Sequence, residues 1–181
     1  MISLSITFNS ANTVLKRLVR DNQIKVSKSF NPYVYIDANS NIKTNSTKIP
    51  HFLRIVEANK QIKKYDNPSI FQVEPKFGNK GAIEPDAYTI IKNVPFFIEV
   101  QRNIYSQKTM NEKIKRYEAL YYSDEFKQFP LIIMITETQY HIDSDILNVF
   151  QVKSIHEFMR NVFKKREKIP NKPNGIKFKI G

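Results

Sequence analysis

Two carboxylates and one amide are the side chains of this sequence whose types and spacing could support chemistry. Asp86 begins a segment of alternating and β-branched residues, 86–91. Glu99 and Gln101 lie at the end of a second such segment, 96–101. Two segments of this kind, separated by a short polar turn, are typical of a β-hairpin. Side chains alternate along a strand, so Glu99 and Gln101 share one face of it.

The position of the turn decides which residues oppose each other. A turn centred between Lys92 and Asn93 makes the numbers of paired residues add to 185, and Asp86 then opposes Glu99. Opposed residues have Cβ atoms about 4.5–5.5 Å apart, so two carboxylates there repel each other. A hard divalent cation that prefers oxygen ligands would compensate them. Alternatively, this is an ordinary solvent-exposed face, and a turn one residue away would reverse the faces.

A resemblance to known proteins rests on these residues. Pro85-Asp86 followed by Glu99-Val100-Gln101 resembles the motif of the PD-(D/E)xK nuclease superfamily, with Gln101 where a lysine usually stands. A longer series over about residues 50–150 resembles the replication-relaxation family of plasmids and integrative elements. The pieces of that series are His51, Glu74, residues 85–88, residues 97–102, Lys113 and Tyr117.

The resemblance implies further site residues. Family members carry a glutamate at the position of Glu74, and PD-(D/E)xK relatives often supply an acid from the helix that here carries Glu57. Lys113, on a helix over the sheet, would supply the cation that Gln101 lacks. The alternatives are a solvated Glu57 and a Lys113 that merely extends along apolar surface to water. The expected catalytic residues are Asp86, Glu99, Gln101 and Lys113, and the expected metal ligands are Asp86, Glu99, Glu74 and Glu57.

Together these residues predict metal-assisted phosphodiester hydrolysis. Carboxylates would hold Mg²⁺ or Mn²⁺, which polarises a phosphate and lowers the pKa of a bound water. Gln101 would orient that water. A neutral amide cannot stabilise transition-state charge as an ammonium does, so the glutamine puts the activity in question.

The elements that must position this site alternate between helices and strands. Apolar residues recur with helical spacing, and Pro50, Ser106 and Ser154 suit helix starts. This alternation predicts an α/β fold, implied by the resemblance to be a restriction-endonuclease-like core with a mixed central sheet flanked by helices. Helices are expected at residues 50–64, 107–122 and 155–168, further strands at 70–74, 129–136 and 149–152, and a helical turn at 145–148.

Residues 1–48 follow a different pattern. A helix is expected at residues 8–19 and two strands at 24–30 and 33–38; a helix followed by a hairpin is the second half of a winged helix. In such a winged-helix-like module the helix lies in the major groove and the hairpin touches the backbone. The preceding residues are too few for the missing helices, so the alternative is an appendage that packs on the core. The expected DNA contacts are Asn12, Thr13, Lys16, Arg17, Arg20, Lys25 and Lys28, with Arg102 in the core.

Charge divides the chain in the same way. The formal net charge of +12 is concentrated at the ends. Residues 1–50 hold seven Lys/Arg and two Asp/Glu, residues 51–163 hold fifteen and fourteen, and residues 164–181 hold seven and one. Basic ends on a near-neutral core suit phosphate binding. The expected organisation is a DNA-binding segment at 1–48, the core at 49–168 and a basic tail at 169–181; an Ile-, Lys- and Asn-rich composition is the alternative cause of the charge.

Several classes of protein are excluded. The chain has no cysteine, which rules out disulfides and thiolate metal sites. Residues 1–10 lack the pattern of a signal peptide, and the apolar run at 130–135 is too short to span a membrane. We therefore expect a cytoplasmic protein. No phosphate-binding G-x-x-x-x-G-K loop is present.

Three functions remain open from the sequence. The first is a DNA-binding protein of a plasmid or integrative element, similar to replication-relaxation proteins. The second is an active Mg²⁺- or Mn²⁺-dependent endonuclease. The third is a transcriptional regulator or accessory factor with a catalytically silent core that serves for dimerisation. Duplex DNA is the expected partner, and a homodimer the expected assembly of the third.

Overall fold

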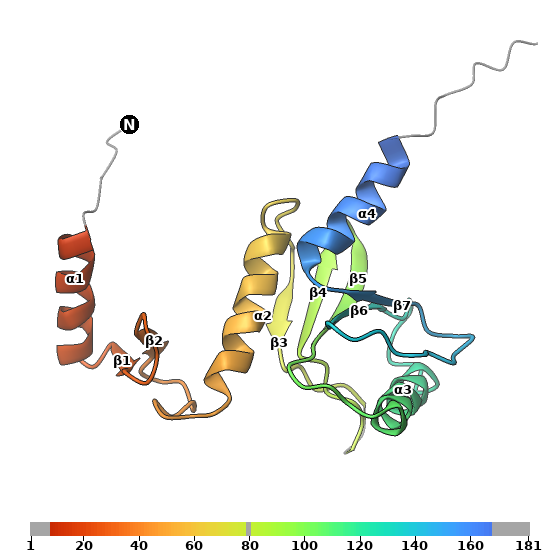
Figure 1. The fold of residues 1–181 in the computed structure, drawn as a ribbon, viewed down its shortest axis with the longest axis horizontal. Helices are drawn as coiled ribbons and strands as arrows, with labels where there is room; N and C mark the ends of the chain where they lie inside the picture. The colour runs from red at the N-terminus through yellow and green to blue at the C-terminus, as the bar shows by residue number, and fades with distance from the viewer. Residues whose placement is uncertain (1–7, 79–80, 168–181) are drawn as a thin grey trace, which may run out of the picture. The chain divides into compact units, whose positions relative to one another are not determined.

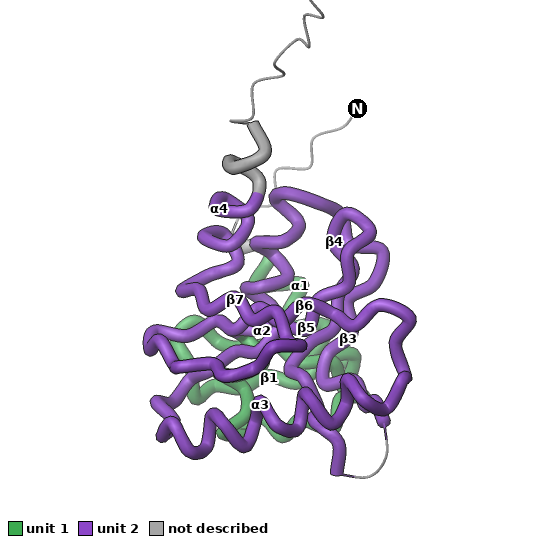
Figure 2. Tube along the Cα trace, turned by 90° about the vertical axis from the view of Figure 1, so that its right-hand side faces the viewer, with its two compact units in different colours: residues 1–53 green, residues 54–181 purple. Residues whose placement is uncertain are grey.

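The computed structural model describes residues 8–78 and 81–167. The chain divides into two compact units, Met1–Leu53 and Arg54–Gly181 (Figure 2). The expected basic tail at 169–181 lies outside the described residues. No helix among those described is long and apolar enough to cross a membrane.

The first unit contains a helix and a two-stranded hairpin, as expected. Strands β1 and β2 are antiparallel, with Ser27 opposite Val34, and are shorter than the sequence indicated. Leu15 and Leu18 on the helix are partly buried, whereas Val14 is 43% exposed. The elements are α1 (Phe8–Arg20), β1 (Ile24–Ser27) and β2 (Val34–Asp37).

The second unit is built on a five-stranded mixed sheet in the order β3-β4-β5-β6-β7 (Figure 1). Strands β3, β4 and β5 are antiparallel, and β5, β6 and β7 are parallel. This confirms an α/β fold with a mixed sheet flanked by helices. Its elements are α2 (Ile49–Ile62), which begins in the first unit, β3 (Phe71–Val73), β4 (Ala87–Ile91), β5 (Val94–Val100), α3 (Gln107–Tyr121), β6 (Leu131–Ile135), β7 (Val149–Val152) and α4 (Ile155–Glu167).

The turn between β4 and β5 fixes the register of the hairpin. Lys92 and Asn93 have φ values of +49° and +64°. Two successive positive φ angles match the right-handed twist of the flanking strands and allow a two-residue connection. Ile91 therefore pairs with Val94 and Ala87 with Ile98, which confirms that paired numbers add to 185.

Helices cover the two faces of the sheet. Phe97 of β5 belongs to an apolar cluster with Met110, Ile114 and Tyr117 of α3. Its neighbour Phe96 points to the other face, where its ring lies 5.6 Å from that of Phe158 in α4. The sheet is thus sandwiched between α3 on one face and α4 on the other (Figure 1).

The helix starts predicted at Ser106 and Ser154 are confirmed. The prediction of a helical turn at 145–148 is wrong. Ser106 accepts a hydrogen bond from the Thr109 N–H, and Ser154 Oγ accepts one from the Glu157 N–H at 3.1 Å. Residues 145–148 contain no helix. Leu147 is buried in the cluster beneath α3, and this tertiary contact decides the local conformation.

Candidate active site

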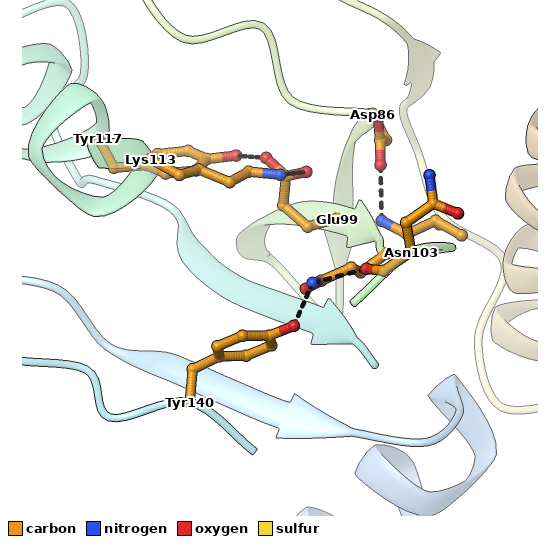
Figure 3. A network of polar contacts seen from close by, with 8 residues as sticks. Asp86, Glu99, Asn103, Lys113, Tyr117 and Tyr140 are labelled. Atoms are coloured by element: carbon orange, nitrogen blue, oxygen red, sulfur yellow. Dashed lines mark hydrogen bonds and ion pairs between the residues drawn. The ribbon is translucent and has the colours of Figure 1, made fainter. Parts of the chain in front are cut away.

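Asp86 and Glu99 occupy the end of the central hairpin. Asp86 lies directly before β4, and the observed register, continued by one residue, sets it opposite Glu99. The Glu99 side chain is only 2% exposed because α3 covers it, so the alternative of an ordinary solvent-exposed face is wrong. Asp86 Oδ2 accepts a hydrogen bond from the Val100 N–H at 2.6 Å (Figure 3).

Helix α3 provides two partners for Glu99. Lys113 Nζ donates to one carboxylate oxygen and forms an ion pair, and Tyr117 Oη donates to the other (Figure 3). Residues four apart lie on the same face of a helix, so both side chains reach the sheet together. The Lys113 side chain is 20% exposed and that of Glu99 2%, so the ion pair is largely buried.

Burial controls the protonation of the two acids. It raises the pKa of Glu99, and the charge of Asp86 raises it further, against the opposing effects of Lys113 and Tyr117. Burial also raises the pKa of Asp86, with a smaller contribution from Glu74, against the Val100 N–H and Lys113. Two close carboxyls that resist simultaneous ionisation hold a proton or a cation strongly.

Lys113 and Tyr117 respond to the same environment. Burial lowers the pKa of Lys113, but the charge of Glu99 and its hydrogen bond outweigh this, so the pKa lies above its ordinary value. Burial and the charge of Glu99 raise the pKa of Tyr117 well above its ordinary value. Lys113 is therefore a cation and Tyr117 a neutral donor at neutral pH.

A pocket of about 450 Å³ opens beside this group. Asp86, Glu99 and Lys113 all line it, which brings three of the four expected catalytic residues to one cavity. Arg116 adds a second cation to the wall, and its Nη2 donates to the Ala82 carbonyl at 3.1 Å. The remaining lining residues are Gly81, Ala82, Ile83, Glu84, Tyr105, Thr109 and Glu112.

Gln101, the fourth expected catalytic residue, does not line this pocket. Its Nε2 donates to Tyr140 Oη at 2.6 Å and to the Asn103 carbonyl at 3.0 Å. Since the Asn103 carbonyl can only accept, the amide nitrogen must face it. The motif position usually held by lysine is therefore turned to a structural contact, and Lys113 is the ammonium that lines the cavity.

The other two expected metal ligands are placed differently. Glu74 is exposed, its N–H donates to the Asp86 carbonyl at 3.0 Å, and its charge acts on Asp86. Glu57 is exposed on α2, accepts a hydrogen bond from Gln61, and lines a separate pocket with Val100, whose side chain points away from Glu99. The structure therefore brings Glu74 near the carboxylate pair and does not bring Glu57 to it.

The donor set decides whether a cation would fit. Within residues 8–78 and 81–167, no group of three or more His, Cys, Asp or Glu residues is arranged to hold a metal ion. Mg²⁺ usually keeps several waters and binds through one or two carboxylates and substrate phosphates. Asp86 and Glu99 fit that smaller requirement in number and in ligand type, because both present carboxylates to the same pocket.

The expected DNA contacts are mostly accessible. Arg20 Nε forms an exposed ion pair with Asp21 at 2.9 Å. Lys25 is the exception, since it is partly buried and donates to the Ser40 carbonyl. The exposed members are Asn12, Thr13, Lys16, Arg17, Arg20 and Lys28 in the first unit and Arg102 after β5.

Sequence reasoning missed several residues around the site. Glu84, Tyr105, Thr109, Glu112 and Arg116 line the pocket, and Tyr140 holds Gln101. The helical spacing of Arg116 from Lys113 could have indicated it. Tyr140 lies far along the chain and gave no local signal.

Comparisons with known proteins add little. No family model matches the chain, and no curated protein matches it. Among solved structures, protein VC1899 from Vibrio cholerae is similar with a TM-score of 0.41 and 12% sequence identity. The similarity covers 87% of this chain and 43% of that one, so this chain spans less than half of the length of VC1899.

Proposed function

We propose that the protein binds DNA and that its core, of PD-(D/E)xK type, hydrolyses phosphodiester bonds with Mg²⁺ or Mn²⁺. The observation that carries this proposal is the meeting of Asp86, Glu99 and Lys113 at one pocket. Two carboxylates beside an ammonium are the groups that a metal-dependent nuclease needs. On the resemblance given above, the DNA would be that of a plasmid or integrative element.

Each residue has a separate role in this proposal. Asp86 and Glu99 would hold the cation, which when bound polarises a phosphate and lowers the pKa of water. Lys113 would stabilise the negative charge that develops on the phosphate, and Arg116 would help to orient it. Tyr117 and the Val100 N–H keep the carboxylates in place.

The charge distribution supports binding of DNA. Residues 1–50 carry a net charge of +5, and the exposed Lys16 and Arg17 lie on α1. A hairpin follows that helix, in the order of a winged-helix half. Surface cations that displace counterions from phosphates give affinity without sequence preference.

Cleavage of supercoiled plasmid tests the proposal. The wild type, Asp86→Ala and the control Asp145→Ala are compared with Mg²⁺, Mn²⁺ or EDTA, and binding of the same DNA is measured in parallel. Asp145 is exposed and lies outside the pocket. Metal-dependent nicking by the wild type and the control, lost in Asp86→Ala while binding persists, is the expected result.

One observation favours a second candidate, a DNA-binding accessory factor or regulator with a silent core. Both oxygens of Glu99 already accept hydrogen bonds, from Lys113 and Tyr117. An ion pair of this kind can replace a cation rather than assist one. Binding of the plasmid without cleavage in any metal would establish this function and overturn the hydrolytic one.

A further inference from the structure

The loop after β5 presents apolar side chains beside the charged pocket. Ile104 is 81% exposed and Tyr105 is 37% exposed. Tyr105 lines the pocket together with Asp86 and Lys113. Ile104 is the neighbour of Tyr105 in this loop, so a largely exposed apolar side chain adjoins the ring that lines the pocket.

Hydrogen bonds hold this loop in place. Tyr140 Oη accepts from the Tyr105 N–H at 2.9 Å and from Gln101 Nε2 at 2.6 Å, so it bridges both ends of the loop. Tyr140 is only 7% exposed, and its own N–H and carbonyl are bound by the side chain of Gln151 at 2.7 and 2.8 Å. Buried groups therefore fix the backbone that carries Tyr105.

Charged side chains of both signs lie near the apolar pair, because the pocket is also lined by Glu84, Asp86, Glu99 and Glu112. Arg102 is exposed in the same loop, and Lys113 and Arg116 line the adjoining pocket. A nucleic acid strand offers a phosphate and a base at each step, so phosphates would meet the cations while a base meets the ring. Proteins bind single strands by stacking bases on aromatic rings while cations contact the backbone phosphates. Here Lys113, Arg116 and Arg102 are the cations, and the divalent cation of the proposed function would offset Asp86 and Glu99.

We infer that the site takes an unpaired DNA strand, with one base stacked on Tyr105 and a neighbouring base against Ile104. In a duplex, each base face is covered by its neighbours, so an aromatic side chain reaches it only where the strand is open or unstacked. This inference rests on the proposed function and names its substrate class. It assigns Tyr105 and Ile104 to substrate binding and leaves the chemistry to Asp86, Glu99 and Lys113.

Binding of labelled oligonucleotides in EDTA tests the inference. A single strand of about 20 nucleotides, longer than the site of one single-strand-binding fold, is compared with a blunt duplex of the same sequence. The full chain is used as wild type, Tyr105→Ala, Tyr105→Phe, Ile104→Ser and the control Tyr122→Ala. Tyr122 is 71% exposed and does not line the pocket.

The expected result is tighter binding of the single strand by the wild type. Tyr105→Ala should weaken single-strand binding by roughly tenfold or more, Tyr105→Phe should retain it, and duplex binding should change little. Equal effects of Tyr105→Ala and Tyr122→Ala, or equal wild-type affinity for both forms, would overturn the inference. Absence of wild-type binding to either form would instead overturn the proposed function, and melting temperatures establish that each variant is folded.

Discussion

Lys113 on α3 forms an ion pair with Glu99 on β5, and the carboxylate beneath it is 2% exposed. The helix thus supplies the ammonium beside Glu99, whereas Gln101, directly after the same strand, is bound to Tyr140 and Asn103. A change at this ion pair should therefore affect both the stability of the core and the chemistry of the pocket.

Lys113→Met should destabilise the fold. The substitution leaves the Glu99 carboxylate buried without its counter-charge, which costs about 3 kcal/mol near neutral pH for a pair of this burial. The cost should fall in acid, because a protonated Glu99 carries no charge to compensate. Urea denaturation at two pH values measures both effects.

Two controls isolate the ion pair. Lys115→Met removes an exposed lysine of the same helix and should change the unfolding free energy by no more than about 0.5 kcal/mol. The double variant Glu99→Gln/Lys113→Met should lose less stability than Lys113→Met alone, because the amide is neutral. If the double variant loses the sum of both single effects, the two side chains are not coupled.

Asp86→Asn should stabilise the protein at neutral pH. Burial raises the pKa of Asp86, so the folded state binds its proton more tightly than the unfolded chain does. Stability that depends on this proton is full below about pH 4 and is lost as the pH rises through the folded-state pKa. The asparagine carries no such dependence, and its amide oxygen can still accept the Val100 N–H.

The stability difference between Asp86→Asn and the wild type should grow with pH. It should begin near its acid value at about pH 4 and level off above the folded-state pKa, and each unit of raised pKa contributes about 1.4 kcal/mol to the plateau. Urea titrations between these limits measure it, and Asp145→Asn reports the effect of removing one exposed charge. A difference that shrinks as the pH rises would show that Asp86 is stabilised as the anion.

The sequence predicted the hairpin and its register because local chemistry decides both. Lys92 and Asn93 have positive φ, and residues typical of strands flank them. With the turn at these two residues, the numbers of paired residues add to 185, which pairs Asp86 with Glu99. The helix at 107–122 was also predictable from periodicity, whereas the expectation that Lys113 approaches the site came from the family resemblance.

The positions of Gln101, Glu57 and residues 145–148 depend on contacts between segments that are distant in the sequence. Gln101 was expected in the site because alternation puts it on the face of Glu99, but Tyr140, far along the chain, holds its amide elsewhere. Glu57 was expected from the family resemblance, whereas α2 carries it into a separate pocket. The helical turn expected at 145–148 is absent, and Leu147 is buried in the apolar cluster instead. No local pattern encodes any of these contacts.

Tyr140→Phe should loosen the loop after β5 without affecting the carboxylates. The hydroxyl accepts from the Tyr105 N–H and from Gln101, and its removal leaves both donors without that partner. A loss of about 1–3 kcal/mol in unfolding free energy is expected. Hydrogen exchange at the Tyr105 amide should accelerate, whereas Tyr121→Phe, on an exposed ring, should leave it unchanged.

Arg17→Ala should reduce the salt dependence of DNA binding. If Arg17 on α1 contacts one phosphate, its loss removes one released counterion, and the slope of log affinity against log salt should decrease by about 0.9 for duplex DNA. Lys127→Ala, an exposed change in the core, should leave the slope as it is. Arg20→Ala should have a smaller effect, because Arg20 already pairs with Asp21. Fluorescence anisotropy across a salt series measures all three slopes, and an unchanged slope in Arg17→Ala would remove α1 from the DNA interface.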